Sequence, residues 1–365
     1  MSATTTNKMV TDARGAEETR ASAISLRWII SASDDLVWFI GSVLSSYALL
    51  ALYLANVLPL YWMVGAWAVL IDAPHVFGTF SRTYFDRTER VARKRLLLGS
   101  LLFFLVGPAM VLAGAGLVFF FLAAIWAYYH LVKQHYGFMV LYKKKNKDLS
   151  PIDNALDRLL LLLAFTYPFV AFIAVDAEAM ARVPAPLRSA FGLLANVTLA
   201  ATVITALVWL ARQLQRVAQR LPLDVPKYLL LAAAIPMHWV VLLTPMPHKT
   251  IAIVAILTIY HNLQYHRLIW FHNRKYAGGD ESRKVYGAAE VISRRLVYYI
   301  AFGILFGLWY QGPRQYLLSQ GDAQARTFQL VTSFLWGYAF IHYYLDSKIW
   351  RVRRDPAVGK ALRLE

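Results

Sequence analysis

Apolar residues along this chain gather in long runs that are separated by short polar segments. A run of about 20 apolar residues is long enough to cross the hydrocarbon core of a bilayer as an α-helix. Ten such runs are present, and they cover residues 36–55, 60–80, 96–113, 116–142, 159–175, 191–210, 228–243, 251–271, 296–310 and 328–349. Because a helix satisfies its own backbone hydrogen bonds in lipid, the pattern predicts an all-α bundle of about ten transmembrane helices.

Lysine and arginine are distributed unequally between the segments that join these runs. Of the 38 residues of these two types, 31 lie in the two tails and in the segments that follow even-numbered runs, whereas 5 lie in the opposite segments. Cytoplasmic segments of membrane proteins carry such an excess, so we expect both termini to be cytoplasmic. The predicted domains are a tail over 1–35 that includes an interfacial helix at 22–35, one membrane domain over 36–350, and a basic tail over 351–365.

Composition supports this class and narrows the possible chemistry. Hydrophobic residues make up 58% of the chain, charged residues 16%, and the mean hydropathy is +0.45. The positive side chains behind the net charge of +17 are expected to face anionic lipid headgroups. Nucleic acid is not expected to be a partner. The absence of cysteine excludes disulfides, thiolate metal sites and iron–sulfur clusters. We expect an integral protein of the plasma (inner) membrane.

Histidines are concentrated at one depth of the predicted bundle. Seven of the nine lie in the cytoplasmic halves of even-numbered runs, where polar residues are costly and usually functional. Neutral imidazole and carboxylate groups are good ligands for iron, zinc, copper and manganese. The sequence therefore predicts a metal site whose ligands are His75, His130, His135, His261, His266, His342 and Asp346. Supporting roles are expected for Asp72, Gln134, Tyr265 and His272.

The spacing of these residues limits how they can share a site. His342 and Asp346 are four residues apart and lie on the same helix face. The two His-x4-His pairs differ, because five residues advance about 140° around an ideal helix. Both rings of a pair reach one centre only if the helix is bulged or unwound; otherwise one ring binds a second metal or orients the first. His238 is expected to be a hydrogen-bonded structural residue, and His248 to lie in an exposed loop.

The order of these motifs resembles that of the Brp/Blh-type β-carotene dioxygenases, which are membrane-embedded non-haem iron enzymes. The resemblance is carried by Pro74-His75, by His130, by the pair His261 and His266, and by His342 with Asp346. It implies iron bound by these histidines and a lipophilic substrate. The pair is spaced by five residues instead of four, and His135 is an addition. The His-x4-His boxes are also similar to the first His box of membrane fatty-acid desaturases and hydroxylases.

These observations predict a membrane oxygenase that holds one or two iron ions, with zinc, copper and manganese as alternatives. Its substrate would be a lipophilic small molecule that enters from the membrane lipid, and the reaction would be hydroxylation, desaturation or oxidative cleavage. No nucleotide-binding motif occurs in the sequence, so electrons would come from a partner protein. The alternative function is a metal-ion or proton-coupled transporter that uses the same histidines. A membrane scaffold is a third possibility, and it predicts no bound metal.

Overall fold

The computed structural model describes residues 24–319, 325–351 and 356–362, and it is 83% helical. Within these residues, seven stretches are long and apolar enough to cross a membrane. Four are single helices: α9 (Gly116–Lys145), α10 (Pro151–Val175), α12 (Ala190–Ala218) and α13 (Val225–Leu243). Three are built from consecutive short helices. The first consists of α2 (Ala32–Asp34), η1 (Asp35–Ile40) and α3 (Val43–Leu54), and the second of α4 (Leu60–Trp67), η2 (Ala68–Asp72) and α5 (Ala73–Thr83). The third consists of α7 (Lys94–Ser100) and α8 (Phe103–Leu112).

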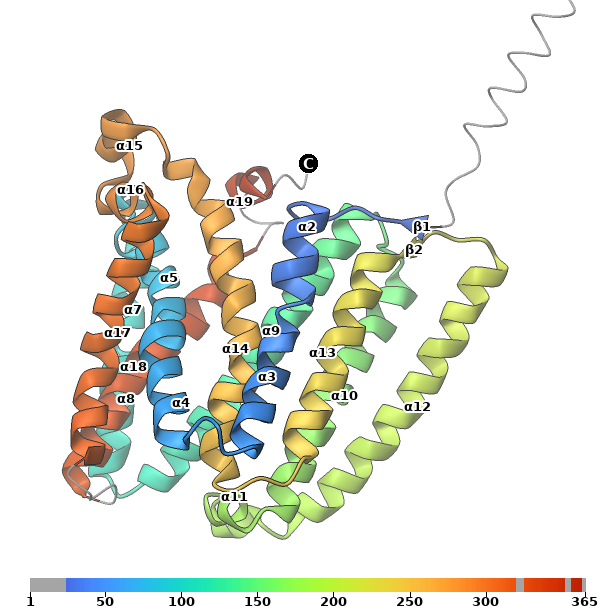
Figure 1. The fold of residues 1–365 in the computed structure, drawn as a ribbon, viewed down its shortest axis with the longest axis horizontal. Coiled ribbons are helices and arrows are strands. Elements are labelled where there is room, and N and C mark those ends of the chain that lie inside the picture. Colours follow the sequence, from blue (N-terminus) through green and yellow to red (C-terminus); the bar gives the residue numbers. More distant parts are fainter. Residues whose placement is uncertain (1–23, 320–324, 352–355, 363–365) are drawn as a thin grey trace, which may run out of the picture.

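Three more helices have 24 residues each, which corresponds to about 36 Å at 1.5 Å per residue. They are α14 (Lys249–His272), α17 (Leu296–Ser319) and α18 (Arg326–Ile349). All three stand alongside the apolar helices in the bundle (Figure 1). The chain is therefore an all-α integral membrane protein, as the sequence predicted. The count of ten membrane crossings stays a prediction.

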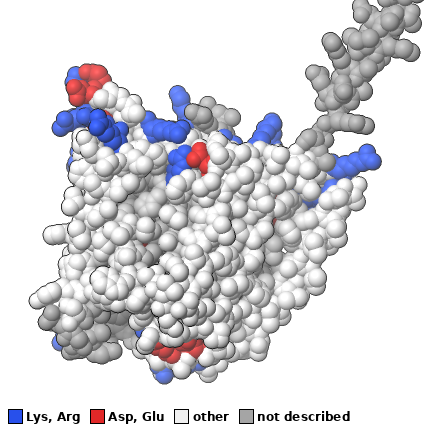
Figure 2. Space-filling model, viewed as in Figure 1, with Lys and Arg blue, Asp and Glu red and all other residues white. Residues whose placement is uncertain are grey.

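The remaining elements are short and connect the long helices. They are β1 (Ile24–Ser25), α6 (Arg87–Ala92), α11 (Ala177–Ala181), η3 (Ala185–Leu187), β2 (Leu223–Asp224), η4 (Asn273–Tyr276), α15 (Gly279–Tyr286), α16 (Ala288–Ser293) and α19 (Pro356–Ala361). In Figure 1, β1, α2, α15 and α19 all lie at the upper end of the bundle. On the face drawn in Figure 2, most of the lysine and arginine side chains gather at this same end. The cytoplasmic location of this end stays a prediction.

The segment before the first span differs from the predicted interfacial helix at 22–35. Its described part begins with β1, which pairs in parallel with β2. The Asn146 side chain accepts from the backbone N–H of Arg27 at 2.9 Å and donates to its carbonyl oxygen at 3.0 Å, so it holds this backbone as a neighbouring strand would. Helix begins only after Ser31, which caps α2. Tertiary contacts with distant residues therefore replace the local helix. Residues 1–23, 352–355 and 363–365 of the predicted tails lie outside the described residues.

Close helix contacts depend on glycine. A Cβ added to Gly107 of α8 would lie 2.5 Å from the carbonyl oxygen of Ser333 in α18, and one added to Gly337 of α18 would clash with Phe104 of α8. Without water inside a membrane to drive association, small residues let helices approach closely enough for favourable packing. These glycines therefore fix the position of α18 against α8.

We predict that Gly337→Ala destabilises the protein by about 1–3 kcal/mol, because the added methyl group overpacks the contact with Phe104. The matched control is Gly99→Ala in α7, where an added Cβ meets no atom within 4 Å. Thermal unfolding of both variants in detergent checks the difference. Equal midpoints for the two variants would contradict the close packing of α8 and α18.

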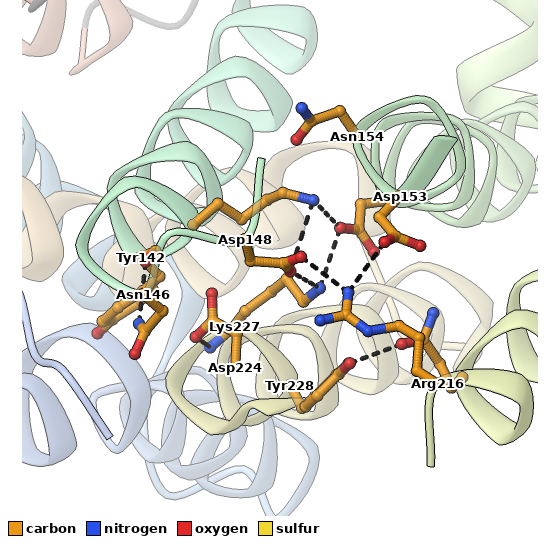
Figure 3. A network of polar contacts seen from close by, with 12 residues as sticks. Tyr142, Asn146, Asp148, Asp153, Asn154, Arg216, Asp224, Lys227 and Tyr228 are labelled. Carbon is orange, nitrogen blue, oxygen red and sulfur yellow. Dashed lines mark hydrogen bonds and ion pairs between the residues drawn. The ribbon is translucent and has the colours of Figure 1, made fainter. Parts of the chain in front are cut away.

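A buried ion network joins α9, α10, α12 and α13 near β1 and β2 (Figure 3). Lys227 donates to Asp148 at 2.7 Å and to Asp157 at 3.0 Å, while Arg216 donates to Asp148 at 2.8 Å. Lys143 of α9 pairs with Asp157 of α10. Burial alone would raise the pKa of Asp148, but the ammonium groups of Lys227 and Lys143 hold that pKa below its ordinary value. The network therefore ties four helices together through paired charges.

We expect Lys227→Met to destabilise the protein by about 3–5 kcal/mol, because it leaves Asp148 and Asp157 buried with one cation fewer. Lys284→Met is the control, since Lys284 pairs with Glu281 on the exposed surface of α15 and exposed pairs contribute little. Chemical denaturation in mixed detergent micelles measures both. A loss in Lys227→Met no larger than that in Lys284→Met would show that the network is not stabilising.

Candidate metal centre

Four helices each bring one histidine to a common point inside the bundle. His75 lies on α5, His130 on α9, His261 on α14 and His342 on α18. One ligand-type atom from each of these residues lies within 4.8 Å of all the others, and all four side chains are buried. We call these four residues the histidine group. The sequence predicted each of them as a ligand, and the structure brings them together.

The nitrogen contacts inside the histidine group indicate a site for a cation. His342 Nε2 lies 2.8 Å from His75 Nε2 and 3.1 Å from His130 Nε2. A neutral imidazole nitrogen offers either one hydrogen or one lone pair. His342 Nε2 has room for one good hydrogen bond, so it cannot be fully hydrogen-bonded to both neighbours at once. A metal ion bound between the rings would instead use a lone pair from each of the three nitrogens.

Thr79 fixes which nitrogen of His342 faces the histidine group. Its hydroxyl lies 2.7 Å from Asp346 Oδ1 and 2.7 Å from His342 Nδ1. An ionised carboxylate only accepts, so the Thr79 hydroxyl donates to Asp346 and accepts from His342 Nδ1–H. The lone pair of His342 then lies on Nε2, toward the other three rings. Such a hydrogen-bonded partner behind a ligand histidine is typical of protein metal sites.

Asp346 occupies a supporting position instead of the predicted ligand position. Its Oδ1 accepts from Thr79 at 2.7 Å and from Tyr265 at 2.8 Å, and its Oδ2 lies 3.8 Å from His342 Nδ1. The i, i+4 spacing does place Asp346 and His342 on one face of α18, as expected. The two hydroxyl donors, however, hold the carboxylate behind His342. Tyr265 has the supporting role that the sequence predicted.

The two His-x4-His pairs each place one ring in the histidine group and the other outside it. His266 Nε2 lies 3.1 Å from the carbonyl oxygen of Ile71, and its Nδ1 lies 3.0 Å from the Tyr299 hydroxyl, so both nitrogens are engaged. His135 contacts the ring of His238 instead. Both α9 and α14 are regular α-helices at these positions, and five residues therefore turn the second ring away.

The other predicted supporting residues lie at different distances from the histidine group. Gln134 donates to the carbonyl oxygen of His261 at 2.8 Å. Asp72 accepts from Asn262, the neighbour of His261, at 3.2 Å. His272 lies away from the histidine group, with its ring beside Trp350 and its Nδ1 toward Asn273. The predicted supporting role is therefore compatible with Gln134 and Asp72 but not with His272.

The two remaining histidines have the surroundings that the sequence suggested. His238 is buried and hydrogen-bonded through Nδ1 to the carbonyl oxygen of Ala234. His248 is exposed and precedes α14. Sequence reasoning missed Thr79, although its position four residues after His75 places it on the same helix face.

A π-helical stretch, η2, leads directly into the segment that carries His75. Pro74 has no N–H to donate, and the wider turn of a π-helix accommodates that loss. The departure from a regular α-helix therefore lies just before Pro74. His75 follows it in the first turn of α5.

Comparisons of the chain with family models, with curated proteins and with solved structures find no match. The resemblance to the carotenoid dioxygenases therefore stays a prediction. The histidine group itself is the observation that bears on function.

We predict that Thr79→Val weakens metal binding by about 10- to 100-fold, because it removes the hydroxyl that orients His342. Thr83→Val is the control, since the Thr83 hydroxyl donates only to the carbonyl oxygen of Thr79 within the same helix. Thr79→Ser keeps the hydroxyl and is expected to restore affinity. Competition with a chromophoric chelator measures all three, and unchanged affinity in Thr79→Val would exclude this positioning role.

Proposed function

We propose that this chain is a membrane-embedded non-haem iron oxygenase that acts on a lipophilic substrate. The observation that carries the proposal is the histidine group, in which four helices converge on a buried set of neutral nitrogen ligands. Fe(II) held by histidines, with coordination positions left open, supplies the chemistry that binds and activates O2. His75, His130, His261 and His342 would hold the ion.

The surroundings of the histidine group support a substrate that comes from the bilayer. The ring of Tyr343 stacks on His130 with centroids 4.4 Å apart, and Tyr265 lies 4.5 Å from His75. These aromatic faces provide apolar contacts beside the nitrogen ligands. A lipophilic molecule can reach such a site without passing through water, because the helices that carry the histidines stand within the membrane bundle.

A transporter is the second candidate, and two observations favour it. His130 and His261 lie near the middle of α9 and α14, and the π-helical η2 interrupts the helix before His75. Transporters place their binding groups near the membrane midplane, beside broken helices. The orientation of His342 through Thr79 and Asp346 favours a resident ion instead, since cargo must be released. We therefore place the oxygenase first.

We expect the protein, reconstituted with Fe(II) under anaerobic conditions, to retain iron that His261→Ala and His342→Ala both lose. His266→Gln is expected to keep the iron, because both nitrogens of His266 are already engaged. His248→Asn, at an exposed position, controls for handling of the variants. Mass spectrometry of the purified samples gives the metal identity and amount.

The outcomes separate the candidates. Retained iron that reacts with O2 supports the oxygenase, and retained zinc, copper or manganese would correct the metal. Movement of a metal ion across vesicles that contain the protein would favour the transporter. Absence of any bound metal after reconstitution would contradict both and leave a scaffold role.

A further inference from the structure

A second pair of histidines meets inside the bundle, apart from the histidine group. His135 of α9 and His238 of α13 are both fully buried, at 0% exposure. Their ring centroids are 5.5 Å apart, and the ring planes are nearly perpendicular at 88°. The proposed oxygenase uses neither residue, so the pair requires its own explanation.

The hydrogen bonds of this pair fix where its protons are. His135 Nδ1 lies 3.0 Å from the carbonyl oxygen of Leu131, and His238 Nδ1 lies 2.8 Å from that of Ala234. A carbonyl oxygen only accepts, so each Nδ1 carries the hydrogen and each Nε2 carries a lone pair. Both Nε2 atoms are buried and, among the described residues, have no hydrogen-bond partner. Two buried acceptors without a partner are unfavourable.

The side chains around the pair do not supply the missing donor. Tyr260 packs against His135, but its hydroxyl donates to the carbonyl oxygen of Phe39 at 2.6 Å. Tyr128 packs near His238, and its hydroxyl donates to the carbonyl oxygen of Phe165 at 2.6 Å. Among the described residues, no carboxylate forms an ion pair or hydrogen bond with either ring. The surroundings of the pair are thus aromatic and uncharged, and the pair itself offers two nitrogen lone pairs.

We propose that His135 and His238 bind one Cu(I) ion through their Nε2 atoms. A divalent ion would bring two charges into an interior without a compensating anion, and it would prefer more than two ligands. A monovalent copper ion carries half that charge, accepts a pair of ligands, and is suited to imidazole.

The spacing of the rings agrees with a shared ion. Imidazoles that bind one ion at about 2.0–2.1 Å per nitrogen place their centroids no more than roughly 6 Å apart. The 5.5 Å between His135 and His238 satisfies this limit. It is close to the 5.2 Å between His130 and His261 in the histidine group. The five-residue spacing on α9 thus directs His130 to one site and His135 to the other.

The test uses the full-length protein in detergent, stripped of metal and titrated anaerobically with Cu(I) against a chromophoric Cu(I) chelator. Because copper can also bind the histidine group, the titration is made in a His75→Ala/His342→Ala background. We expect this protein to retain one copper ion per chain, with two nitrogen neighbours in its X-ray absorption spectrum. Adding His238→Phe or His135→Phe is expected to abolish the binding, whereas adding His248→Asn leaves it unchanged.

Two results would overturn the proposal. One is failure of the His75→Ala/His342→Ala protein to take up copper, which is the result expected if a water molecule satisfies the two nitrogens. The other is a copper spectrum with four nitrogen neighbours, a readout that does not depend on whether His238→Phe folds. The copper proposal and the oxygenase proposal can fail separately. Iron retention is tested by variants of His261 and His342, whereas copper retention is tested by variants of His135 and His238.

Discussion

The constraint on which this structure depends is the burial of four imidazoles whose nitrogens converge. Polar nitrogens buried in a medium of low dielectric constant are costly unless each one is paired, and His342 Nε2 cannot be fully hydrogen-bonded to both His75 and His130. The fold accepts this because each ring comes from a different helix, and because the hydroxyl of Thr79 holds His342 with its Nε2 lone pair directed inward. The arrangement is stable only if the helices cannot separate, and it becomes favourable when a cation is shared.

Two different kinds of packing keep the helices in place. On one side of the histidine group, glycine contacts bring α18 against α8 and α17 against the segment that carries His75. On the other side, buried charges join α9 to α10 and α13. The first kind depends on close approach of backbones, and the second depends on paired charges that cannot be exposed to lipid. His130 and His135 lie on α9, between the two regions, which is why the two sites can face different neighbours from one helix.

Much of this could be predicted from the sequence, since hydropathy and charge act locally. The lengths of the apolar runs predicted the long helices. The concentration of histidines in one half of the even-numbered runs predicted a site that includes His75, His130, His261 and His342. The hydrogen bond from Thr79 to Asp346 could not be predicted, because the two residues are distant in sequence. The carboxylate that accepts this bond was expected to be a metal ligand. The fate of each His-x4-His pair depended on whether α9 and α14 were regular, which spacing alone left open. The strand at Ile24–Ser25 depends on Asn146, over a hundred residues away.

Charge balance gives Asp346 a role even from its position behind His342. Four neutral imidazoles bring no negative charge to a divalent ion, so a nearby anion must offset part of its charge. Asp346 Oδ2 lies 3.8 Å from His342 Nδ1. An ion bound at His342 Nε2 would lie farther from the carboxylate, so their attraction would be weaker than the roughly 4 kcal/mol between unit charges at about 4 Å and an effective dielectric constant of 20. Acting through Thr79 and His342, the carboxylate would stabilise an ion held by the four histidines without being one of its ligands. A site built only to retain a metal would gain more from direct ligation, so this indirect arrangement favours a centre at which a further molecule binds.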